Sequence, residues 1–71
     1  MNVLVGVDDL SDTKLYEMLR AIGPCTVERM GETLDADYLV DINTGVLTFA
    51  VGHDRISMLR SDIINITPRA A

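Results

Sequence analysis

The chain has 71 residues, a formal net charge of −5, one cysteine and one histidine. This length allows one domain with a small core, which is marginal for a solitary monomer, so self-association is expected to support the fold. The acidic balance excludes a broad duplex-binding surface, a single cysteine excludes an internal disulfide, and the lone cysteine and histidine make no zinc pattern, so no metal or other cofactor is expected.

The first ten residues open with a short apolar run that soon turns acidic at Asp8 and Asp9. This run is too short for a secretory signal, and nowhere does the chain approach the roughly 20 apolar residues of a membrane span. A cytoplasmic protein without membrane contact is therefore expected. Residues 1–10 can form either an arm or an extra strand, and the pattern leaves both open.

A helix is predicted over residues 12–22. Acidic and capping residues precede it, and its apolar residues follow the spacing of one helical face. Gly23 suits the position just after the helix and Pro24 prevents its continuation. The apolar face comprises Leu15, Met18, Leu19 and Ile22.

Short apolar runs separated by turn residues follow Pro24 and predict antiparallel strands rather than more helix. We expect one domain over residues 1–71, mostly β with one N-terminal α-helix. Its sheet, within residues 25–67, should bend strongly and close into a small, partly open five-stranded antiparallel barrel. Cys25, Tyr38 and Phe49 are predicted to pack in the core. The five expected strands are 26–30, 33–41, 46–51, 55–59 and 63–67.

A polar corner at residues 60–62 carries an arginine and precedes an apolar run that Pro68 ends. Proline lacks the N–H needed for a strand ladder, so the last strand should stop there. If the chain performs any chemistry, this corner is where it is expected. The simpler alternative is a solvated corner, with residues 43–45 forming an ordinary hairpin turn.

The order of one helix and five strands, with three short motifs, resembles the Sm-like family and its bacterial Hfq branch. Residues 26–34 look like the family's first strand and tight turn. Residues 59–63 are similar to both the Hfq signature Tyr-Lys-His-Ala-Ile and the Sm2 signature Ile-Arg-Gly-Asp/Asn, and residues 66–69 resemble the end of short cyanobacterial Hfq-type proteins. The chain departs from Hfq at Ser61, where Hfq has histidine, and at residues 41–45, which lack the aromatic that usually neighbours the aspartate.

The resemblance implies an SH3-like barrel that assembles into a homo-oligomeric ring, a hexamer or heptamer. It also implies binding of single-stranded RNA, U- or A-rich, through the corners after the second and fourth strands. An acidic ring that serves as a protein-binding scaffold without RNA is the alternative, and one ring face rich in arginines would favour RNA. No enzyme is expected, since His53 and Cys25 lie in separate turns. The implied RNA-binding residues are Arg60, Ser61, Asp41, Asn43 and Thr44.

Overall fold

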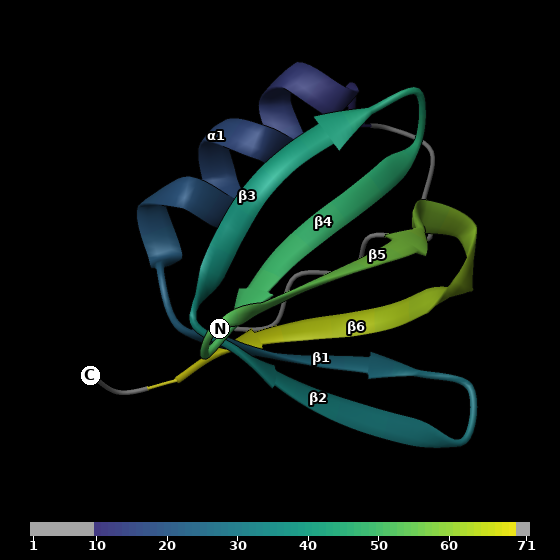
Figure 1. The fold of residues 1–71 in the computed structure, drawn as a ribbon. Coiled ribbons are helices and arrows are strands. Elements are labelled where there is room, and N and C mark those ends of the chain that lie inside the picture. Colours follow the sequence, from purple (N-terminus) through teal and green to yellow (C-terminus); the bar gives the residue numbers. More distant parts are fainter. Residues whose placement is uncertain (1–9, 70–71) are drawn as a thin grey trace.

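The structure is a computed structural model that describes residues 10–69. Within that range the chain forms a small, mostly β domain with one α-helix, six strands and one turn of 3-10 helix (Figure 1). The helix and the 3-10 turn are α1 (Asp12–Ile22) and η1 (Arg60–Asp62). The strands are β1 (Cys25–Arg29), β2 (Glu32–Ala36), β3 (Tyr38–Asn43), β4 (Val46–Val51), β5 (Asp54–Leu59) and β6 (Ile63–Pro68).

The predicted helix is confirmed with the same bounds. Ser11 caps its start, because the Ser11 hydroxyl oxygen accepts a hydrogen bond from the Lys14 N–H at 3.2 Å. Gly23 ends it with a φ of 66°, in the region that favours glycine, and its N–H donates to the Leu19 carbonyl. The buried face of α1, centred on Leu15 and Leu19, therefore faces the strands.

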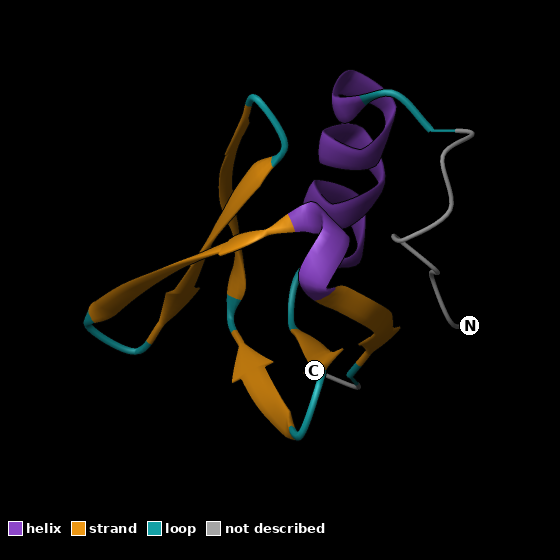
Figure 2. Cartoon of the chain, turned by 90° about the vertical axis from the view of Figure 1, so that its right-hand side faces the viewer, coloured by secondary structure: helices purple, strands orange, loops and turns teal. Residues whose placement is uncertain are grey.

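The strands form two antiparallel three-stranded sheets, in the orders β2-β1-β6 and β3-β4-β5. In Figure 1 the strands converge at one end of the molecule and spread apart at the other, and α1 lies beside β3. Figure 2, turned by 90°, shows the helix near the top of the view, with strands at its left and below it. Neither sheet is closed.

The structure has six strands where five were predicted, because the expected strand over residues 33–41 is interrupted at Asp37 and forms β2 and β3. Ala36 and Leu39 are both buried although they are three residues apart, and side chains of one flat strand share a face only at even spacing. The chain must therefore change direction between them. The Asp37 N–H donates to the Ala50 carbonyl at 2.8 Å, and the Asp37 carboxylate accepts from the Gly52 N–H at 2.8 Å.

The core joins both sheets and the helix. Val27 faces Ile66 across β1 and β6, Leu39 faces Phe49 across β3 and β4, and all four are buried. Such cross-strand apolar pairs stabilise a sheet face. Cys25 is also buried, so the predicted core positions of Phe49 and Cys25 are confirmed.

The arm or extra strand predicted for residues 1–10 lies outside the described residues, apart from Leu10, which packs against the core. Across residues 10–69, no helix is both long and apolar enough to cross a membrane.

Candidate functional site

Two chain corners meet at one end of the molecule. The β3–β4 turn contains Thr44 and Gly45, and the corner after β5 is the turn η1. The Arg60 N–H donates to the Gly45 carbonyl at 2.8 Å, which joins the two corners directly. This bond continues the β4–β5 pairing by one residue beyond Val46 and Leu59, so the corner with Asn43 and Thr44 lies beside the corner with Arg60.

The β3–β4 turn has an unusual backbone at Thr44. Both Thr44 and Gly45 have positive φ, 52° and 76°. Hairpins favour this geometry because its twist matches that of the flanking strands, but it suits glycine or asparagine better than a β-branched residue. The Thr44 hydroxyl donates to the Asn43 side-chain oxygen at 3.0 Å, so the two predicted site residues also contact each other.

Arg60 is held by the start of the helix, and no sequence motif predicted this contact. Its guanidinium Nη1 donates to Asp12 Oδ1 at 3.1 Å, and Asp12 Oδ2 accepts from the Gly45 N–H at 3.1 Å. The side chain of Arg60 is 17% exposed and that of Asp12 is 40% exposed. Helix start, hairpin turn and corner are thus tied together by one carboxylate.

Asp41 lies on a neighbouring surface along α1 and β3. Together with Asp12, Thr13, Tyr16 and Ile42 it lines a shallow hollow of about 210 Å³. This hollow adjoins the Asp12–Arg60 pair, because Asp12 belongs to both. The structure therefore places Asp41 near the joined corners, with a helix residue between them.

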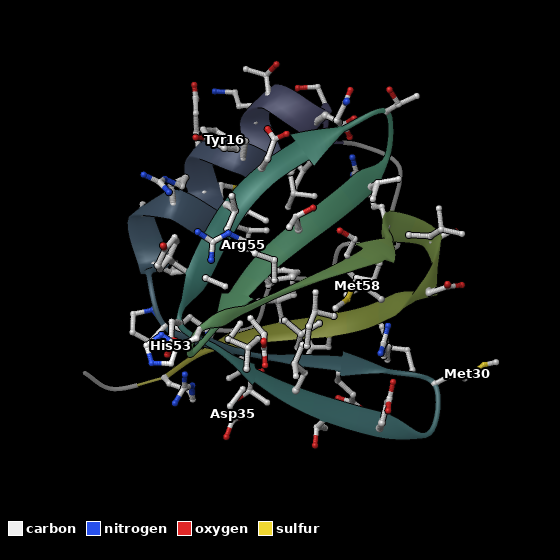
Figure 3. The ribbon with its side chains drawn as sticks, viewed as in Figure 1. Tyr16, Met30, Asp35, His53, Arg55 and Met58 are labelled. Atoms are coloured by element: carbon white, nitrogen blue, oxygen red, sulfur yellow. The ribbon has the colours of Figure 1, made fainter. Side chains whose placement is uncertain are left out.

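Beyond the hollow, Arg20 lies between two tyrosine rings. The Arg20 guanidinium carbon is 5.8 Å from the centroid of the Tyr16 ring and 5.8 Å from that of the Tyr38 ring, within cation–π range. Its Nη1 donates to the Leu39 carbonyl at 3.0 Å, which fixes its position between the rings. Figure 3 shows Tyr16 on the helix. We call this surface the α1–β3 seam, made of Asp12, Tyr16, Arg20, Tyr38 and Asp41.

The predicted core position of Tyr38 is wrong, since Tyr38 is 41% exposed. The break at Asp37 turns the chain between β2 and β3, and Tyr38 is the first residue after it. The i, i+4 spacing of Tyr16 and Arg20 was a usable sequence signal, because such pairs meet on a helix surface. Nothing local to Tyr38 indicated that it would join them.

Ser61 follows Arg60 in η1, but its surroundings differ from those of the other predicted residues. It lines a different hollow, of about 430 Å³, with Asp62, Ile64 and residues of the β1–β2 turn. Met30 projects outward at that turn (Figure 3). The five predicted site residues are therefore divided between the joined corners, the seam and this second hollow.

The arginines do not gather on one face. Arg29 pairs with Glu32 at one end of β1, whereas Arg69 donates to the carbonyls of Cys25, at the other end of β1, and of Ala36. Arg55 lies on β5, near the middle of the view in Figure 3. A continuous arginine-rich surface, the feature that would favour RNA most strongly, is thus not formed by these side chains.

The lone cysteine and histidine stand apart from these surfaces. His53 lies in the β4–β5 turn, at the opposite end of β5 from Arg60 (Figure 3). Burial raises the pKa of the Cys25 thiol, and the nearby Arg69 charge opposes that shift. In the part of the chain that the structure describes, no three His, Cys, Asp or Glu side chains are grouped to hold a metal ion.

Comparisons of the chain with protein-family models, with curated proteins and with solved structures found no match. Its function is therefore inferred from the geometry of residues 10–69 together with the resemblance of its short motifs to the Sm-like family.

Proposed function

We propose that this protein is a subunit of a homo-oligomeric Sm-like ring that binds single-stranded, U- or A-rich RNA. The observation that carries the proposal is the Arg60 N–H to Gly45 carbonyl hydrogen bond of 2.8 Å. It joins the two corners to which the Sm-like resemblance assigns RNA contacts. The order of one helix followed by strands, with the last strand paired to β1, supports the same fold.

In this proposal β2 and β3 act as one strand bent at Asp37, which gives a five-stranded, partly open barrel. The order is then β6-β1-β2/β3-β4-β5, with β5 and β6 at the two outer edges. Leu59 at the end of β5 is 53% exposed and Ile64 on β6 is 49% exposed. Pairing β5 of one copy with β6 of the next covers both edges and both apolar side chains, and a closed ring leaves no open edge.

RNA contacts are assigned to the joined corners and the α1–β3 seam. Arg60 supplies a local cation, Asn43, Thr44 and Asp41 supply polar groups for base edges, and Tyr16 and Tyr38 supply flat faces. Stacking of one base on an aromatic side chain contributes about 1–3 kcal/mol and tolerates any base. One set of weak contacts in each subunit is multiplied around a ring. Ser61 would contact the RNA separately, from the second hollow.

The test is sedimentation of the purified full chain with fluorescent U-rich and A-rich oligonucleotides at low and moderate salt. The expected result is a ring that carries an oligonucleotide and loses it as salt rises, since phosphate contacts release counterions. Arg60→Ala should weaken binding about tenfold or more without dissolving the ring. Arg55→Ala, which removes the same charge from exposed β5, is the matched control. Equal binding by both variants would show that the corner is not the site.

A scaffold function is the second candidate. It is favoured because several arginines already bind acceptor groups of the protein itself. Arg29, Arg60 and Arg69 all bind protein acceptors, and the net charge is −5. An acidic ring of this kind repels nucleic acid and suits a basic protein partner. In the sedimentation experiment, this candidate is supported by a ring that binds neither oligonucleotide at either salt concentration.

A further inference from the structure

Asp12 is the acidic partner of Arg60, the cation to which the proposed function assigns an RNA phosphate. One carboxylate oxygen accepts from the Arg60 guanidinium and the other from the Gly45 N–H, each at 3.1 Å. The Gly45 carbonyl in turn accepts from the Arg60 N–H. Asp12, Gly45 and Arg60 thus form a closed cycle of contacts, and the negative charge in it belongs to the protein.

We propose that Asp12 is an intrinsic competitor that masks Arg60 and sets the RNA affinity of the joined corners. This inference rests on the proposed RNA-binding function and names a determinant of its strength. A phosphate that binds Arg60 either displaces the Asp12 carboxylate or shares the guanidinium with it. Both routes weaken binding, because two anions then compete for, or repel each other across, one cation.

The Asp12–Arg60 ion pair is weak enough for a ligand to displace Asp12. Asp12 is 40% exposed, so water screens its attraction to Arg60. Exposed ion pairs change an equilibrium by a factor of about one to five, which a polyanion in contact with several subunits can overcome. A multivalent RNA strand should therefore bind despite Asp12, and a single phosphate group should bind several-fold more weakly than it would without Asp12.

The test compares Asp12→Asn with Glu17→Gln, using the fluorescent U-rich and A-rich oligonucleotides and the full chain. Both changes raise the net charge by one on the same helix, but Glu17 is exposed and no part of the cycle. Asparagine keeps an oxygen to accept from the Gly45 N–H. The oligonucleotide that the wild type prefers should bind Asp12→Asn about 2- to 5-fold more tightly than Glu17→Gln at low salt. The difference should shrink as salt rises.

Equal affinities of these two variants would overturn the inference. Asp12→Ser, which also keeps an oxygen acceptor but no charge, replaces Asp12→Asn if thermal unfolding shows that the asparagine variant does not fold. The double variant Asp12→Asn/Arg60→Ala should show no gain over Arg60→Ala alone, because the mask acts only through the arginine. A gain that persists without Arg60 would also contradict the mask.

Failure of this inference differs from failure of the proposed function. If Arg60→Ala loses RNA binding but Asp12→Asn gains no affinity, the assignment of the RNA site is supported and the proposal that Asp12 masks Arg60 is wrong. If wild type and Asp12→Asn both fail to bind either oligonucleotide, the proposed function fails and the mask fails with it. If only Asp12→Asn binds, the wild-type protein does not bind RNA and the proposed function fails. The inference fails with it, because a partly exposed ion pair is too weak to abolish binding.

Discussion

At the scale of single residues, burial depends mainly on the side chain itself, whereas the partner of a charged group depends on which elements pack together. Cys25 and Phe49 are buried as predicted, because the hydrophobic effect favours burial of small and large apolar side chains alike. Arg60 lies at the predicted corner, but its partner, Asp12, comes from a segment 48 residues away. The packing of the elements decides which carboxylate pairs with a given cation. A local sequence pattern therefore does not predict the partner of Arg60.

The pH dependence of stability should report the burial of Cys25. Burial raises the pKa of this thiol in the folded chain, so the unfolded chain releases the proton first as pH rises above about 8.5. The thiol's contribution to stability is complete below that pH and is lost as pH rises through the folded-state pKa. Cys25→Ala should cost about 1–2 kcal/mol at pH 7.

Urea unfolding of wild type and Cys25→Ala from pH 7 to pH 10, under reducing conditions, checks this. The difference in unfolding free energy between the two proteins should narrow as the solution becomes alkaline. A difference that stays constant over the whole range would mean that the buried thiol titrates alike in the folded and unfolded chains.

At the scale of elements, the helix is encoded locally whereas the bend of the sheet is not. Ser11 and Gly23 mark the ends of α1 in the sequence and cap it in the structure. Asp37 gives no comparable local signal, and its bend is held by Ala50 and Gly52, contacts that exist only once β4 has packed. The three-residue separation of the apolar Ala36 and Leu39 was the one feature of the sequence that indicated a bend.

The carboxylate of Asp37 should stabilise this bend. Asp37→Ala removes the acceptor of the Gly52 N–H and should cost about 1 kcal/mol of unfolding free energy, since the bond is partly screened by water. Asp54→Ala, which removes the same charge from the nearby start of β5, should cost less than about 0.5 kcal/mol. Denaturant unfolding measures both. If the backbone hydrogen bond of Asp37 alone holds the bend, Asp37→Ala and Asp54→Ala should lower the unfolding free energy equally.

At the scale of the whole molecule, the two outer strands control the proposed assembly. Ile64→Lys places a charge on the β6 edge, where it would be buried against the β5 edge of the next copy. We expect this variant to sediment as single chains under conditions where the wild type forms a ring. Leu59→Lys, on the β5 edge, should do the same.

The matched control is Thr33→Lys, because Thr33 is exposed on β2, at the opposite edge of the sheet that contains β6. It adds the same side chain without touching the proposed β5–β6 contact. Dissociation by Thr33→Lys as well would point to a general charge effect. An intact ring in Ile64→Lys and Leu59→Lys would rule out the edge pairing.

The sequence by itself determined the features that depend on neighbouring residues. These are the helix with its caps, the mostly β class and the apolar positions at Cys25 and Phe49, because propensity, capping and burial act within a few residues or on single side chains. It also placed polar residues at both corners.

Only the tertiary structure decided how these parts meet. It divided the second predicted strand at Asp37, exposed Tyr38 beside Arg20, placed Ser61 in a hollow beside the β1–β2 turn and gave Arg60 a carboxylate partner from the helix. Each of these outcomes depends on which distant segments pack together. That choice is made by the shared core and by hydrogen bonds between elements, whose partners are far apart along the chain.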